Sequence, residues 1–163
     1  MPPHSRDVRI QLSVLDRLLD DEPRNGQEAS VTRSQTLAKL KDALRRDLEW
    51  LLNTRASPEE VGEGFEETGS SVFTYGLPDF SALSAGSDQT RARLERVLQR
   101  ALETFEPRLL HVVVQSVSED KKSDKRILRF LISGWLRMEP SPLQVSFDTR
   151  LDLARGEYRI AED

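Results

Sequence analysis

The C-terminal half of the chain constrains the fold most, because stretches of alternating apolar and polar residues follow one another there with only short polar connections. Successive side chains of a strand point to opposite faces, so this alternation predicts strands with one buried face. The connections are too short for a crossover helix, so neighbouring strands must be antiparallel. The predicted strands of this meander are the valine-rich residues 109–118 and the alternating residues 127–138 and 143–151, with Tyr158 and Ile160 in a last strand after a turn at Gly156.

Two amphipathic helices are predicted before the meander. Residues 32–54 carry leucines three and four positions apart, and residues 87–105 repeat the pattern after a Ser87 cap. Pro107 disfavours helical angles at Glu106, so the second helix must end there. The predicted fold class is α+β, with N-terminal amphipathic helices packed on a C-terminal, mostly antiparallel β-meander.

The chain length of 163 residues corresponds to one domain at about 150 residues per domain. Residues 31–163 hold the long helices and all the strands, so we expect a single α+β domain there. Residues 1–30 are predicted to form an N-terminal tail with a short amphipathic segment and a linker. The segment either packs on the domain or docks on a partner, and its apolar residues are Leu12, Leu15, Leu18 and Leu19.

The region between the two helices has little periodicity. Residues 59–67 hold five glutamates and no basic residue, which is typical of a solvated loop. Residues 72–75 (Val-Phe-Thr-Tyr) are apolar and predict either one short strand or a buried loop. Gly76 and Pro78 then end this piece.

The composition excludes several classes of function. The chain has no cysteine, so it holds no disulfide, no thiolate metal site and no thiol nucleophile. Its net charge of −4 gives no electrostatic footprint for nucleic acid. No stretch approaches the about 20 apolar residues of a membrane span, and charges interrupt the apolar residues that a signal peptide would need. We therefore expect a soluble, cytoplasmic protein that neither binds nucleic acid nor inserts into a membrane.

Catalytic and cofactor sites find no support in the sequence. The histidines, His4 and His111, are far apart, and His111 is predicted to be a half-buried strand residue. A nucleophile elbow is missing, and Glu67 stands where the dinucleotide motif that starts at Gly62 needs a glycine. We predict no catalytic residue, no metal and no cofactor. Paired carboxylates of a glycosidase remain a less favoured alternative.

One charged pair stands out, at Glu106-Pro107-Arg108. Residues two apart on an extended backbone point to the same side. A carboxylate and a guanidinium would thus project together from a corner that proline stiffens, and such a pair is suited to clamp a partner's backbone or charged side chains. The alternative is a local ion pair at the helix terminus, and the spacing leaves both open.

Several segments together resemble one family. Residues 45–55 (RRDLEWLLNTR), 71–81 (SVFTYGLPDFS) and 105–109 (FEPRL) occur in the order and spacing of the TssE family. TssE proteins are type VI secretion baseplate subunits, related to the small wedge protein of contractile phage tails. Residues 13–23 look like the start of that family and residues 147–160 like its last strands, so the resemblance spans nearly the whole chain.

The resemblance implies a structural role. Such a protein joins the baseplate wedge beside TssF and TssG and near TssK, in a cytoplasmic baseplate docked at the inner membrane. It would template the contractile sheath, made of TssB and TssC, by strand pairing. The family's Glu-Pro-Arg signature is associated with contacts to the wedge core, which implies partner binding by Glu106, Pro107 and Arg108.

Two further expectations remain. Templating by strand addition requires an open sheet edge, and we expect it in residues 143–160, because no later element follows to cover that region. The alternative function is a regulatory anti-adaptor of related fold. A lysozyme-like glycosidase is less favoured still.

Overall fold

A computed structural model describes residues 33–57, 59, 61–62, 64–80, 87–117, 126–138 and 141–161. The proposed N-terminal tail and its amphipathic segment lie outside the described residues, as does His4. The described chain holds two long helices, with two short 3₁₀ helices between them in sequence. A four-stranded antiparallel sheet follows the second long helix. This confirms the predicted α+β class and the meander.

The sheet has its strands in sequence order, as connections of this length require. Its strands match the alternating stretches closely, and Gly156, with a φ of +67°, turns the chain into the last one. Every second residue of the central strands is buried, so one face of the sheet forms the core. The strands are β1 (Leu109–Val117), β2 (Ile127–Leu136), β3 (Leu143–Asp152) and β4 (Glu157–Ala161).

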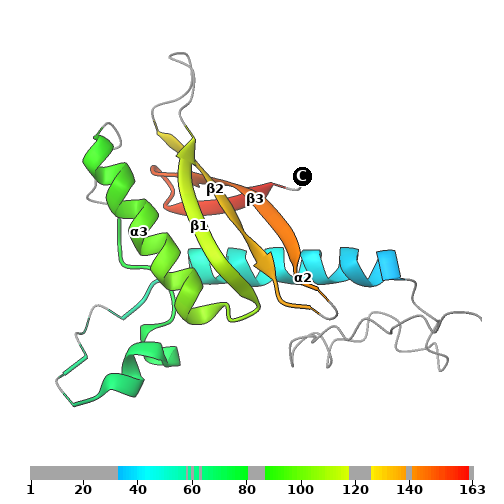
Figure 1. Cartoon of the computed structure of the whole chain (residues 1–163). Coiled ribbons are helices and arrows are strands. Elements are labelled where there is room, and N and C mark those ends of the chain that lie inside the picture. Colours follow the sequence, from blue (N-terminus) through cyan, green and yellow to red (C-terminus); the bar gives the residue numbers. More distant parts are fainter. Residues whose placement is uncertain are drawn as a thin grey trace, which may run out of the picture.

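The two helices cover the apolar face of the sheet and lie towards its two edges. Helix α2 (Arg33–Asn53) lies beside β4, and helix α3 (Asp88–Phe105) lies beside β1 (Figure 1). As predicted, Ser87 caps α3, and its hydroxyl accepts a hydrogen bond from the Thr90 amide. Leucines of both helices meet the sheet's apolar side chains in one core, which includes Leu44, Leu48, Leu98, Leu102, Phe130 and Ile132.

The segment between the helices returns to the end of α2 through one tight contact. Leu77 donates a backbone hydrogen bond to Thr54 O (2.8 Å) and accepts one from Ala56 N (2.9 Å). The chain reaches this position through Gly76, which has a φ of +113°, and a Cβ there would lie 2.4 Å from Thr54 O. Only glycine combines this angle with so close an approach.

The prediction of a strand or buried loop at residues 72–75 is wrong for most of the stretch. Val72–Thr74 is a 3₁₀ turn, and Val72 is 89% exposed. Only Tyr75 packs inward, where its ring meets Phe105 edge-on, 5.3 Å between centroids. The first 3₁₀ helix, Glu66–Ser70, begins inside the acidic stretch. The described glutamate side chains of that stretch, Glu59 and Glu67, are exposed, as expected for a solvated loop.

His111 differs from its expected half-buried position. It is exposed and has a φ of +51°, at a β-bulge where the register with β2 shifts between Leu110 and Val113. A bulge inserts one extra residue and re-aims its side chain. The sequence carries no sign of it, because the apolar runs on both sides, Leu109-Leu110 and Val112 to Val114, have no alternation whose break could mark a bulge.

Candidate functional site

The Glu-Pro-Arg segment forms the corner between α3 and β1. Glu106 caps the helix, donating its backbone N–H to Leu102 O (2.9 Å), and its own carbonyl accepts from Leu109 N (3.0 Å). Pro107 is exposed at the tip of the corner. The chain thus leaves the helix and enters the sheet within three residues, which holds Glu106 and Arg108 at a fixed separation.

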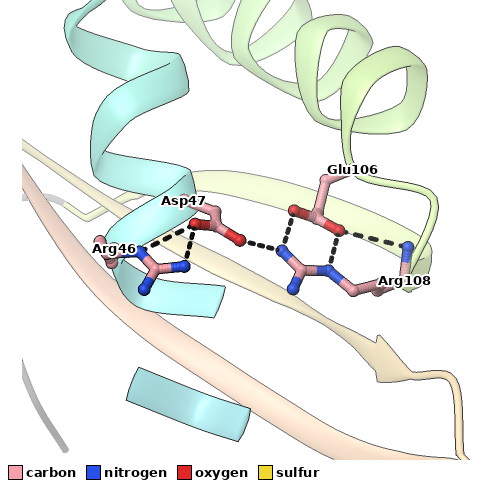
Figure 2. Close-up of polar contacts among 4 residues, drawn as sticks. All are labelled: Arg46, Asp47, Glu106 and Arg108. Carbon is pink, nitrogen blue, oxygen red and sulfur yellow. Dashed lines mark hydrogen bonds and ion pairs between the residues drawn. The ribbon is translucent and has the colours of Figure 1, made fainter. Parts of the chain in front are cut away.

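The two charged side chains of the corner bind each other (Figure 2). Arg108 Nε donates to Glu106 Oε1 (2.6 Å), and Nη2 donates to Glu106 Oε2 (2.7 Å). This paired arrangement fits the planar guanidinium to both carboxylate oxygens and is stronger than a single contact. The prediction that both side chains leave the backbone on the same side is therefore confirmed.

A third residue, which the sequence pattern did not single out, extends the pair to the other helix. Arg108 Nη2 also donates to Asp47 Oδ2 on α2 (2.6 Å), and Arg46 donates to the other oxygen of Asp47, Nε at 3.1 Å and Nη2 at 2.8 Å (Figure 2). The Arg46 guanidinium in turn lies over the Trp50 ring, 5.1 Å from its centroid. We call Arg46, Asp47, Glu106 and Arg108 the corner network.

The corner network is largely removed from water. Glu106 is 6% exposed, and the Arg108 side chain is 17% exposed. Hydrogen bonding to Glu106 raises the pKa of Arg108 most, against the opposing effect of burial. Burial raises the pKa of the neighbouring Tyr75 hydroxyl, and the charges of Asp47 and Glu106 raise it further. Charges in a low-dielectric site are stable only when they are paired. Because one of these pairs links Arg108 to Asp47 on α2, the corner network holds α2 against the α3–β1 corner.

Of the two alternatives for the corner, the ion pair within the chain is present. It is buried and joins two helices, so truncating either partner would disturb folding as well as any binding. Partner binding by Glu106, Pro107 and Arg108 remains a prediction.

The β4 edge of the sheet is covered, contrary to the expectation of an open edge in residues 143–160. Asn53 Nδ2 donates to Tyr158 O (2.9 Å), and its Oδ1 accepts from Tyr158 N (2.8 Å). Glu49 Oε1 accepts from Ile160 N (3.1 Å). The element that covers this edge is α2, which lies more than a hundred residues earlier in the chain. The expectation of an open edge considers only elements that follow in sequence.

The β1 edge is bound at one position. Glu95 Oε1 on α3 accepts from the backbone N–H of Ser116 (2.7 Å). Backbone groups of alternate edge residues point away from the sheet, so Val114 presents its polar groups on the same side as Ser116. Residues 109–117 form a longer edge than residues 157–161.

Across the part of the chain that the structure describes, no group of three histidine, aspartate or glutamate side chains is placed to hold a metal ion. Of the described helices, none has the length and apolarity needed to cross a membrane.

Comparison with known proteins gives the family. The model of the family described as "Baseplate wedge protein gp25" matches residues 38–141, well over half of the chain. The chain belongs to the gp25 family of baseplate wedge proteins. This confirms the resemblance of the sequence to the contractile-tail wedge family and makes the protein a baseplate component. The matched residues include most of α2, the corner network and the strands β1 and β2 of this gp25-family chain.

This gp25-family member is also similar to a solved structure. A chain in a solved structure described as "The baseplate complex from the type VI secretion system" is similar over 80% of this chain and 97% of that chain. The two are 19% identical, with a TM-score of 0.47. The comparison with curated proteins found no match.

Proposed function

We propose that this chain is the TssE-type subunit of a type VI secretion baseplate. It acts by assembly and not by catalysis, joining a wedge of TssF and TssG near TssK, in a cytoplasmic baseplate docked at the inner membrane. The observation that carries the proposal is the gp25-family match across residues 38–141. The type VI machine, in preference to a phage tail, is supported by the sequence resemblance of residues 45–55, 71–81 and 105–109 to TssE.

The wedge contact is proposed at the corner. Pro107 is the exposed member of the Glu-Pro-Arg segment, while Glu106 and Arg108 hold the backbone on either side of it. A partner that docks here would meet Pro107 directly, because Glu106 and the Arg108 side chain are largely buried behind it. The corner network serves this contact by fixing its shape before binding, which lowers the ordering cost of association.

Pro107→Glu tests the wedge contact without removing a charge from the corner network. The added carboxylate would place a negative charge in the contact, and at an exposed site its effect on folding is about 0.5–1 kcal/mol. Co-expressed with TssF and TssG, the variant is expected to lose co-purification. Pro142→Glu, an exposed proline in the β2–β3 connection, is the matched control and should co-purify normally. Normal co-purification of Pro107→Glu would exclude the corner as the wedge contact.

Sheath templating is proposed at the β1 edge, by addition of a strand from TssB or TssC. This edge is longer than that of β4. Glu95 of α3, the helix that lies beside β1, binds its Ser116 N–H, so strand addition requires α3 to move aside. Main-chain hydrogen bonds to Val114 and Ser116 would supply affinity, as in other strand additions. The incoming strand would replace Glu95 as the partner of Ser116.

Ser116→Pro separates templating from folding. Proline is tolerated on edge strands where the missing N–H faces outward, so the monomer should keep its fold while the edge loses a donor. Sheath assembly is expected to fail with Ser116→Pro and to persist with Glu95→Ala, which removes the same intramolecular bond but leaves the donor in place. Sheaths that form normally on a folded Ser116→Pro protein would disprove strand addition at this edge.

A further inference from the structure

Helix α2 binds the edge of β4 at two successive positions, and the spacing of these contacts can be extended beyond the strand. Asn53 binds the backbone of Tyr158, and Glu49 accepts a hydrogen bond from Ile160 N. The red strand β4 runs antiparallel to α2 (Figure 1), so four residues back along the helix correspond to two residues further along the strand. The two steps are nearly equal in length, so the series can continue where β4 ends.

The next pair in this series is Arg45 and Glu162. Glu162 and Asp163 follow β4 in the sequence and lie outside the described residues. The side chains of Tyr158 and Ile160 are buried on the face of the sheet that the helices cover, and strand alternation puts the side chain of residue 162 on that same face. A continued β4 therefore directs the Glu162 carboxylate towards α2 and the Asp163 carboxylate to the outer face.

A cleft of about 200 Å³ lies where the first of these carboxylates would arrive. It separates the N-terminal part of α2 from the part of β3 that continues beyond its pairing with β4. The register of the two strands ends with Asp148 opposite Ala161, so one further step places residue 162 opposite Phe147. The strand side of the cleft and its rim are formed by Val145, Ser146, Phe147 and Ala161. The residue that follows β4 would thus enter the cleft.

The helical side of the cleft carries more positive than negative charge. Its cations are Lys41 and Arg45, and its carboxylate is Asp42. The two cations are four residues apart and so lie side by side on the helix. Arg45 also lies 3.6 Å from Glu49, the residue that binds Ile160, and this contact holds its guanidinium near the end of β4. A guanidinium has five N–H donors, so Arg45 can bind a second carboxylate beside that of Glu49.

We propose that this cleft is the docking site of residues 162–163 of the same chain, with the Glu162 carboxylate bound between Lys41 and Arg45. The contact extends β4 along β3 and fastens the end of the strand to α2. A partner strand that paired with the same part of β3 would have to displace these two residues. The proposal concerns neither the corner network nor the β1 edge, and it does not depend on the type VI assignment.

An engineered disulfide tests the register in the full chain, which has no cysteine of its own. In the continued register Asp163 lies opposite Ser146, which is exposed on the outer face. Opposed residues of antiparallel strands have Cα atoms about 4.5–5.5 Å apart, a distance that a disulfide spans. Ser146→Cys/Asp163→Cys should therefore form a disulfide within one chain on mild oxidation, which mass spectrometry detects as the loss of two hydrogens.

Gln144→Cys/Asp163→Cys is the matched control. Gln144 lies on the same face two residues along β3, and such a diagonal neighbour is about 7–8 Å away, beyond the usual span of a disulfide. The control should oxidise at least tenfold more slowly. Equal rates in the two variants, or cysteines that stay reduced in both, would overturn the proposal. A disulfide between two chains would show that a second copy occupies the cleft, and the proposal would again be wrong.

Charge reversal tests the contact with the helix. Glu162→Lys should lower the melting temperature by about 2–4 °C, because the new ammonium meets Lys41 and Arg45. Lys41→Glu in the same chain should restore it, since the two charges are then exchanged. Asp163→Lys is the control and should leave the melting temperature unchanged, because its side chain points to the outer face.

Equal melting temperatures of Glu162→Lys and Asp163→Lys, or no recovery in the exchanged variant, would refute binding of Glu162 in the cleft. Wedge co-purification can fail while the disulfide forms, so this proposal and the proposed function fail separately.

Discussion

The side-chain amide of Asn53 binds both backbone polar groups of Tyr158, donating to its carbonyl at 2.9 Å and accepting from its amide at 2.8 Å. A neighbouring strand would satisfy this residue with the same two bonds. Glu49, one helical turn earlier, accepts from Ile160, two strand residues further on. The spacings agree, because four helical residues rise about 6 Å and two strand residues about 7 Å. Helix α2 therefore takes the place of a fifth strand.

Asn53→Ala tests this substitution of helix for strand. The variant leaves the amide and carbonyl of Tyr158 without their partner, which should lower the free energy of unfolding by about 1–3 kcal/mol. Hydrogen exchange at the Tyr158 amide should accelerate. Urea unfolding and amide exchange measure the two effects.

The control for Asn53→Ala is Gln99→Ala, which removes an exposed bond to Glu103 on the surface of α3 and should cost at most about 0.5 kcal/mol. Asn53→Asp is a second comparison, since the carboxylate still accepts from Tyr158 N but repels its carbonyl. Unchanged exchange at Tyr158 in Asn53→Ala would show that α2 does not protect the edge.

Local sequence patterns predicted the helices and strands of this fold. They did not predict the side-chain hydrogen bonds that join elements distant in sequence. The leucine spacing of α2 and α3 and the alternation of β2 and β3 follow from which face each element buries, so they are visible in sequence. The bonds of Arg108 to Asp47 and of Asn53 to Tyr158 link residues 61 and 105 positions apart. A polar residue on a helix surface has the same position in the sequence pattern whether it faces solvent or a strand edge. Periodicity therefore does not single out Asp47 or Asn53.

Arg108→Ala should destabilise the fold strongly. It leaves the buried carboxylate of Glu106 without the guanidinium that binds both its oxygens, and breaking a buried pair by removing one partner costs about 3–5 kcal/mol. Chemical denaturation of the purified variant provides the measurement. Arg108→Lys should recover only part of the loss, because an ammonium cannot make the paired contact.

Arg155→Ala is the matched control for the corner. Arg155 lies 3.8 Å from Asp152, and the Arg155 side chain is 66% exposed, so its loss should cost less than about 1 kcal/mol. A loss at Arg108 no larger than that at Arg155 would show that the corner network contributes little to folding.

Gly76→Ala should be among the most damaging single changes in the described chain. The new Cβ would lie 2.4 Å from Thr54 O, and the residue has a φ of +113°, so both sterics and backbone angle oppose alanine. We expect a loss above about 3 kcal/mol, measured by thermal or urea unfolding. Gly156→Ala isolates the backbone term, because its φ is +67° with open space around the Cβ, and should cost about 1–2 kcal/mol. Equal losses at the two glycines would refute the steric argument.

Tyr158→Phe should change the response of stability to alkaline pH. Burial raises the pKa of Tyr158 above the ordinary tyrosine value of about 10. Below that pH both states keep the proton and the free energy of unfolding is unaffected. As pH rises beyond about 10, the unfolded chain releases the proton while the folded chain retains it, so stability falls by up to about 1.4 kcal/mol per pH unit.

Phenylalanine removes that dependence, so the free energy of unfolding of Tyr158→Phe should decline less steeply between about pH 10 and 12. At neutral pH the variant should gain about 1 kcal/mol, because none of the described residues gives the buried Tyr158 hydroxyl a hydrogen-bond partner. Tyr75→Phe is the comparison, since Tyr75 is less deeply buried and its hydroxyl should contribute a smaller slope of the same sign. Urea unfolding at several pH values decides the point, and an alkaline slope in Tyr158→Phe as steep as in the parent would place the titrating group elsewhere.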